Sequence, residues 1–264
     1  MLLNKKLILP LLFASTVACA GGQEPVPTDT PADTNDNIQF TITPYLWAIN
    51  MNGYVGVASL SSQHVSQDFS DIMQNFDAGG MLYLEAKKNG LCIFFNGLYA
   101  ALSQTVHVGS LTINTTNGFG LFSGGVSYET FDRTFQNGSE LSVEPYLGVR
   151  DTLNDATVSI ANTNLSASLN EQWVDPILGA RVNYNITKAW LTVLAADVGG
   201  LSSSDYSFNA NGYIGYKPQT MMKNMVFYLG YRWLHQNYQT GANTNYFSWN
   251  MDIFGPVVGI SFVF

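Results

Sequence analysis

The last ten residues, Gly255 to Phe264, constrain the fold more than any other stretch of the chain. Read with the two-residue period of a β-strand, one face is bulky and apolar, and the other is small or mildly polar. The apolar face consists of Pro256, Val258, Ile260, Phe262 and Phe264. Such a strand invites aggregation at the edge of a soluble sheet, whereas a strand in a closed barrel surrounded by lipid has no free edge. The pattern favours a transmembrane antiparallel β-barrel, with the final core strand of a soluble β domain as the alternative.

The composition agrees with the membrane alternative. Only 11% of the 264 residues are charged, 13% are aromatic, and there are 24 glycines. The mean hydropathy of +0.06 is too low for a bundle of membrane helices, while the charges are too few for an ordinary soluble surface. Strands that alternate lipid-facing and inward-facing residues average to about this hydropathy.

The N-terminal region predicts export. Residues 1–20 have the form of a signal peptide, with Lys5 and Lys6 before an apolar run and Ala18-Cys19-Ala20 as the cleavage site. Lipidation at Cys19 is the alternative to cleavage after Ala20. Residues 21–37 contain three prolines and four acids, which predicts a disordered leader ahead of a barrel at 38–264. Removal of both lysines changes the net charge from −8 to −10, which argues against nucleic acid as a partner.

After that cleavage Cys92 is the single cysteine, so no internal disulfide is possible. The apolar run of the signal peptide is too short to cross a bilayer as a helix, and no other apolar run approaches the roughly 20 residues that a spanning helix needs. The sheet itself must therefore hold this exported protein together.

From residue 38 onward, alternating segments are separated by Asn, Gly and Asp, which predicts about twelve strands, with ten to fourteen possible. Turn signals include Asn50–Gly53, Lys87–Gly90, Thr115–Gly118 and Asn154-Asp155. The segments Leu91–Asn114 and Thr152–Glu171 are hard to divide, since each could be one long strand or a hairpin. A short helix is expected over Phe69–Phe76, with Ser70 or Asp71 as its cap.

The polar face of these strands carries few charges, and the charges are of mixed sign. The residues expected to line the lumen are Glu85, Lys87, Asn96, Glu129, Glu144, Arg150, Asp175, Arg181, Asn183, Asp197 and Arg232. Asp175 and Arg181 share a face, but six residues along a strand span roughly 20 Å, so their partners must come from neighbouring strands. These residues form either an ion-pair network that braces the lumen or a constriction that selects solutes.

Aromatic residues near the expected strand ends are candidates for the interfacial girdles of a membrane barrel. They are Tyr45, Trp47, Tyr99, Trp173, Trp190, Tyr216 and Trp233. The alternative is random scatter in a chain rich in aromatic residues.

A series of short motifs resembles a family of poorly characterised proteobacterial outer-membrane barrel proteins, described mostly as outer-membrane or porin-like. The motifs, in chain order, are Thr43-Pro44-Tyr45-Leu46-Trp47-Ala48 with Gly53, Phe69-Ser70-Asp71-Ile72, Trp173-Val174-Asp175-Pro176 with Gly179 and Arg181, Asp197-Val198-Gly199-Gly200, Gly230-Tyr231-Arg232, and Gly255-Pro256 with Phe264. The last strand also resembles the C-terminal targeting strand of Gram-negative outer-membrane barrels, which makes Ile260, Phe262 and Phe264 the expected assembly signal. The resemblance implies a barrel in a Gram-negative outer membrane, with lipid, lipopolysaccharide and the barrel-assembly machinery as partners. It does not imply an activity.

The sequence favours passage of small solutes through a narrow, porin-like lumen, with a closed structural or adhesive surface barrel as the alternative. A lipid hydrolase or acyltransferase is a third hypothesis, because such enzymes need a serine beside a histidine on the outer wall. His235 stands near the end of a strand, but the next residue is Gln236, and Ser202–Ser204 would have to approach in space. Three scattered histidines and one cysteine predict no metal site, and no motif predicts a cofactor.

Overall fold

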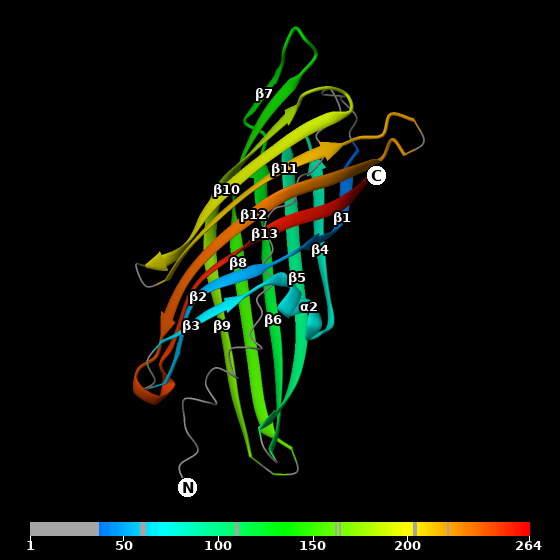
Figure 1. The fold of residues 1–264 in the computed structure, drawn as a ribbon. Coiled ribbons are helices and arrows are strands. Elements are labelled where there is room, and N and C mark those ends of the chain that lie inside the picture. The colour runs from blue at the N-terminus through cyan, green and yellow to red at the C-terminus, as the bar shows by residue number, and fades with distance from the viewer. Residues whose placement is uncertain are drawn as a thin grey trace.

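The computed structural model describes residues 37–58, 62–108, 111–161, 163, 165–202, 205–220 and 222–264. The expected signal peptide and all but the last residue of the expected leader lie outside this part of the chain. The described part is almost entirely antiparallel β-structure (Figure 1). Its only helices are one short α-helix and one 3-10 turn, and none of the described helices is long and apolar enough to cross a membrane.

Ten strands form a closed barrel, because the path from β1 to β13 ends with β13 paired to β1. In order around the wall they are β1 (Gln39–Trp47), β4 (Phe76–Lys88), β5 (Leu91–Val108), β6 (Leu111–Tyr128), β8 (Glu140–Ile160), β9 (Ser166–Asn185), β10 (Trp190–Ser202), β11 (Asp205–Tyr216), β12 (Met225–Thr240) and β13 (Phe247–Val263). Three further strands lie outside this ring: β2 (Asn50–Val57), β3 (Gln63–Gln67) and β7 (Phe131–Thr134). The fold class is therefore confirmed, but the barrel has ten strands and not about twelve.

The surplus in the predicted count comes from turn residues that lie inside long strands. Thr115–Gly118 is within β6 and Asn154-Asp155 is within β8, where both segments face each other in one continuous ladder. Asn50–Gly53 lies in β2. Asn and Gly are poor strand formers on average, but complete pairing on both sides holds them extended here.

The first and last parts of the chain form one long ladder. β1 and β2 pair with β13 in a single register, from Thr41 opposite Val263 to Val57 opposite Phe247. The backbone N–H of Ala48 donates to Pro256 between them, so the two labels describe one strand. The other edge of this strand is divided, because β4 pairs with β1 and β3 pairs with β2.

A short helix, α2 (Phe69–Gln74), interrupts the strand formed by β3 and β4. The helix was predicted correctly, but its N-cap is Asp68 and not Ser70 or Asp71. Asp68 and Asp71 form a capping box, which satisfies backbone N–H groups at the helix start. The side chain of Ile72 is buried and anchors the helix on the interior of the barrel.

The two ends of the barrel differ in their connections. We call the end where β1 begins and β13 ends the near end, and the opposite end the far end. The near end includes a tight turn at Asn89 and Gly90, whose φ angles of 51° and 79° are those of the Asn-Gly hairpin turn. It also carries the β7 hairpin, which extends away from the wall (Figure 1).

The outer face of the wall is apolar around the near half of the barrel. Exposed large side chains on it include Phe40, Ile93, Leu147, Leu178, Leu194, Ile214, Leu229 and Val258, which come from eight different strands. Monomeric soluble proteins do not expose a continuous apolar surface of this extent, whereas the lipid-facing belt of a membrane barrel requires one. On β13 this belt contains the predicted face, with Val258 half exposed and Gly259 and Ser261 buried behind it.

The aromatic residues expected at the interfaces divide into two groups. Tyr99, Trp190, Tyr216 and Trp233 are exposed on the outer face, as girdle residues should be. Tyr45, Trp47 and Trp173 are buried inside the barrel, so their assignment to a girdle was wrong. The prediction rested on the position of each residue along its strand. Whether an aromatic residue lies in a girdle also depends on whether its side chain is on the outer or the inner face of the wall.

Candidate functional site

The polar residues expected in the lumen lie on the inner face of the wall or at its near-end rim. Nine are buried to at least 96%: Glu85, Asn96, Glu144, Arg150, Asp175, Arg181, Asn183, Asp197 and Arg232. Lys87 and Glu129 lie nearer the end of the barrel and are partly exposed. The structure brings most of these residues into two connected clusters.

The first group, which we call the ionic cluster, is centred on Arg181 of β9 toward the near end. The Arg181 guanidinium donates to Glu85 and to the Tyr83 hydroxyl of β4, each at 3.1 Å, and to Glu144 of β8. Three strands separate β4 from β9 on the shorter path around the ring. Lys87 adds a second cation, with its Nζ 3.0 Å from Glu144 and 2.8 Å from Glu129. The cluster therefore joins nearly opposite walls.

A second set of contacts lies next to the ionic cluster. Arg150 of β8 donates to Asp197 of β10 at 2.6 Å and to Ser207 of β11 at 3.1 Å. Asp197 also accepts hydrogen bonds from Tyr146 and Asn209. Arg150 faces Asp175 across the β8–β9 ladder, but no described ion pair joins them. The expectation that partners come from neighbouring strands is met by Arg181 and Glu144, on β9 and β8. It was wrong for Arg150, because Asp197 lies beyond β9 on β10, and for the contact of Arg181 with Glu85, because β4 and β9 are not neighbours.

Arg232 extends this set toward β1. Its Nε donates to the Asn209 side chain at 2.9 Å, and its guanidinium lies 4.5 Å from the centre of the Trp47 ring. A cation over an aromatic face gains electrostatic attraction that grows when water is excluded. Both side chains are almost completely buried.

A third set of contacts joins aromatic side chains, and the sequence analysis did not recognise it as part of the barrel interior. This aromatic cluster consists of Phe119, Trp173, Tyr238, Phe247 and Trp249, from strands β6, β9, β12 and β13 toward the far end. Trp173 and Tyr238 stack with ring centres 4.5 Å apart and planes within 5°. Phe119 and Trp249 stack at 6.1 Å from nearly opposite walls.

Strand parity could have identified part of this cluster from the sequence. Trp173 is separated from Asp175 and Arg181 by even numbers of residues, so all three share the inner face of β9. The same argument places Tyr45 and Trp47 together on one face of β1. Both are buried, and the Tyr45 hydroxyl donates to Asn96 of β5 at 2.8 Å.

The combined arrangement crosses the barrel interior at two levels. Ionic contacts join β4, β8 and β9 toward the near end, and stacked rings join β6, β9, β12 and β13 toward the far end. Between them the Gln236 side chain of β12 donates to Thr152 of β8 at 2.9 Å. A small barrel can be filled by its own inward side chains, and these contacts link opposite walls of this one.

The outer wall carries part of the side-chain arrangement that a lipid hydrolase needs, a histidine beside a carboxylate. His235 Nδ1 lies 3.0 Å from Asp252 Oδ1, and the Trp233 indole donates to the same oxygen. Within the part of the chain that the structure describes, no serine hydroxyl is hydrogen-bonded to His235, and Ser207 on the neighbouring strand is buried on the inner face. Ser203 and Ser204 lie outside the described residues. The described residues also contain no group of three metal-binding side chains.

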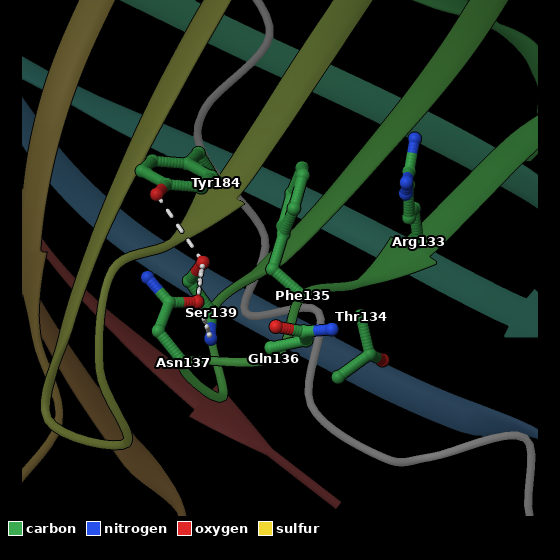
Figure 2. Close-up of a pocket in the computed structure, with 7 residues that line it drawn as sticks. All are labelled: Arg133, Thr134, Phe135, Gln136, Asn137, Ser139 and Tyr184. Carbon is green, nitrogen blue, oxygen red and sulfur yellow. Dashed lines mark hydrogen bonds between the residues drawn. The ribbon is translucent and has the colours of Figure 1, made fainter.

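A pocket lies away from the lumen, between the β7–β8 turn and β9 (Figure 2). It has a volume of about 480 Å³ and is lined by Arg133, Thr134, Phe135, Gln136, Asn137, Ser139 and Tyr184. Figure 2 shows Tyr184 and Ser139 joined by a hydrogen bond of 3.3 Å, with Arg133 at the other side of the pocket.

Comparison with known proteins identifies the fold. No protein-family model matches the chain, and no curated protein matches it in sequence. Among solved structures, the outer membrane protease OmpT from Escherichia coli matches with a TM-score of 0.55 at 10% identity, covering 90% of this chain and 100% of OmpT. The fold is that of an outer-membrane β-barrel.

Other barrels match less well in shape. Ail of Yersinia pestis gives a TM-score of 0.33 at 10% identity, with 87% of this chain and 99% of Ail covered. Neisserial surface protein A gives 0.30 at 13% identity, with coverages of 86% and 98%. The barrel fold and the apolar belt together place this outer-membrane barrel protein in the outer membrane of a Gram-negative bacterium.

Proposed function

We propose that this outer-membrane barrel is closed to solutes and serves a structural or adhesive role at the cell surface. The observation that carries the proposal is the pair of contact layers across the interior, the ionic cluster and the aromatic cluster. A channel for small solutes needs a hydrated path, whereas Arg150, Arg181 and Trp249 are each at most 1% exposed. The porin-like hypothesis is therefore the weaker of the two.

Conductance in planar lipid bilayers tests the proposal. We expect the wild-type protein to give no current steps above background. Variant Trp173→Ala/Trp249→Ala should also stay closed, because the ionic cluster remains. Adding Arg181→Ala and Glu85→Ala to these changes, which removes one positive and one negative charge, should produce steps.

The control for these substitutions is Trp190→Ala, which removes a tryptophan from the outer face and should leave the bilayer silent. Heat-modifiable migration on gels shows whether each variant is folded. Regular current steps from the folded wild-type protein would refute the closed barrel, whether or not the variants assemble.

The lipid enzyme is a second candidate, favoured by the His235–Asp252 pair on the outer wall. A carboxylate beside an imidazole is the arrangement by which a general base is oriented. Release of acyl chains from phospholipid or lipid A by the purified protein, abolished in His235→Ala, would support it. No turnover of either substrate would eliminate it.

The proposed partners are outer-membrane lipid, lipopolysaccharide and the barrel-assembly machinery. The assembly proposal rests on the outward face of β13, where Phe264 is 70% exposed at the end of the last strand. Deletion of Phe264 should lower the amount of heat-modifiable protein in outer-membrane fractions. Phe40→Ala, which removes an exposed aromatic residue from the neighbouring strand, is the matched control and should assemble normally.

A further inference from the structure

Basic residues occur in the near-end connections of the barrel and in none of the far-end ones. The near-end set consists of Lys88 before the β4–β5 turn, Arg133 between β6 and β8, Lys188 between β9 and β10, and Lys217 and Lys223 between β11 and β12. In the sequence, the far-end connections contain no lysine or arginine, and neither do β2, β3 and α2. The protein therefore concentrates its outward positive charge at one rim.

Two adjacent connections of this rim are held together. They are residues 186–189 and 217–224, which we call the paired turns. The Gln219 side chain donates hydrogen bonds to the backbone carbonyls of both turns, to Lys188 at 2.7 Å and to Lys217 at 2.9 Å. The basic residues of the two turns are thus placed on one joined surface.

The positive charge of the paired turns is not offset by acids of the same turns. Neither turn contains Asp or Glu in the sequence. Lys188 and Lys223 are exposed, and neither forms an ion pair with a described residue. Glu140 at the start of β8 lies opposite Asn185 and accepts a hydrogen bond from its side chain at 3.0 Å. The two lysines are therefore available to an anion from the surroundings.

The paired turns adjoin the lipid-facing belt. Trp190 and Tyr216 lie opposite each other where β10 begins and β11 ends, with ring centres 4.9 Å apart, and both are exposed on the outer face. Such rings favour the boundary between acyl chains and headgroups. Lys188 is two residues from Trp190, which places its ammonium group at headgroup level. Ile186 and Met222 are exposed in the same turns, which also fits an interface better than open water.

The shape of the barrel indicates which leaflet this rim meets. β8 and β9 have 21 and 20 residues, and they extend the far end past β10 and β11, which have 13 and 12 (Figure 1). Outer-membrane barrels keep short turns at the periplasmic end and have their larger extensions at the cell surface. This difference favours the periplasmic side for the near end, where the leaflet consists of phospholipids.

We propose that the paired turns bind the phosphate headgroups of anionic phospholipids, with Lys188 and Lys223 as the contacting cations. Basic residues next to a membrane-spanning segment attract anionic lipid, and each cation near the surface adds to the attraction. The interaction is sensitive to salt, since exposed charges are screened within about 8–10 Å at physiological ionic strength. The inference deepens the proposed partnership with outer-membrane lipid, and it does not depend on whether the lumen conducts.

Fluorescence quenching by brominated lipids tests the proposal, because bromine quenches an indole ring only at short range. The purified protein is placed in phosphatidylcholine bilayers that contain the same fraction of brominated phosphatidylglycerol or brominated phosphatidylcholine. Subtraction of the signal of Trp190→Phe isolates the fluorescence of Trp190. At low salt we expect the anionic lipid to occupy the sites beside Trp190 with a preference of about fivefold or more. At about 0.5 M salt the preference should disappear.

Charge variants locate the source of this preference. The double variant Lys188→Gln/Lys223→Gln should abolish it and leave quenching by phosphatidylcholine unchanged. The matched control Lys88→Gln/Arg133→Gln removes the same charge from other connections of the rim and should retain the preference. Lys188→Arg/Lys223→Arg keeps both cations and should behave as wild type. Heat-modifiable migration shows that each variant is folded.

Four results would overturn the proposal. Equal quenching by both lipids in the wild-type protein would mean that the turns do not select a headgroup. A preference that survives Lys188→Gln/Lys223→Gln would mean that other contacts produce it. If unlabelled lipid A displaced the brominated anionic lipid better than phosphatidylglycerol at equal phosphate, the turns would belong to the lipopolysaccharide leaflet. Quenching by neither lipid would mean that this outer face does not contact lipid at all, whereas closure of the lumen is decided separately by conductance.

Discussion

The two halves of the barrel interior are filled by different chemistry. The near half contains the ionic cluster, in which Arg181 contacts Glu85, Glu144 and Tyr83. The far half contains the aromatic cluster, in which flat rings stack across the lumen. Buried charges are stable only with their partners, whereas packed rings are stabilised by area and shape. The halves should therefore respond differently when one member or several members are removed.

The largest expected effect is in the ionic cluster. Arg181→Met should lower the free energy of unfolding by about 3–5 kcal/mol, because it leaves buried carboxylates without a cation. Denaturant titration followed by gel mobility measures it. Arg181→Met combined with Glu85→Gln and Glu144→Gln should recover most of the loss. If the triple variant were as unstable as Arg181→Met alone, the proposed difference between the ionic and the aromatic half would be refuted.

In the aromatic cluster, Trp173→Ala should lower the free energy of unfolding by about 3 kcal/mol, since a large buried ring is replaced by a cavity. Here no second substitution that removes a partner should restore stability. Trp190→Ala, on the outer face, is the control in the same denaturant titration. If adding Tyr238→Ala to Trp173→Ala restored the free energy of unfolding, the packing argument would be contradicted.

A smaller effect measures stacking itself. A double-mutant cycle between Trp173→Leu and Tyr238→Leu should give a coupling of about 1 kcal/mol, the usual value for an aromatic pair beyond its buried area. The four unfolding free energies supply the coupling. A value of zero would mean that the parallel geometry at 4.5 Å contributes nothing specific.

The smallest effect is expected at the rim of the ionic cluster. The side chain of Lys87 is 15% exposed and pairs with Glu129 and Glu144. Lys87→Met should cost about 1 kcal/mol or less, because Glu144 keeps Arg181 and water reaches Glu129. A loss equal to that of Arg181→Met would show that the near half acts as one unit up to its rim.

The same contrast explains what the sequence could predict. A charge cannot face lipid without a large cost, so alternation alone put Arg150, Arg181 and Arg232 inside. Tryptophan is acceptable at a membrane interface and in a packed interior, so Trp173 and Trp190 required strand parity to be distinguished. The contact of Arg181 with Glu85 could not be predicted from alternation, because β4 and β9 are not neighbours in the sheet and their side chains meet only across the barrel interior.

Strand boundaries were the weakest part of the prediction. Asn154-Asp155 and Thr115–Gly118 read as turns, yet they lie opposite each other within β6 and β8. Local composition cannot show that two turn-like segments pair with each other. The helix α2 was predicted well because Phe69–Gln74 carries its signal locally, whereas the observed N-cap, Asp68, precedes the predicted caps by two or three residues.

The long ladder between the chain's beginning and its end has a consequence for biogenesis. β1 and β2 gain their second neighbouring strand only when they pair with β13, which is made after the other described strands. Until β13 has been synthesised and exported, β1 has no second neighbour and the sheet remains an open ribbon. Closure of the barrel must therefore wait for β13, so a chain that is terminated before this strand cannot seal itself and remains dependent on chaperones or becomes a substrate for proteases.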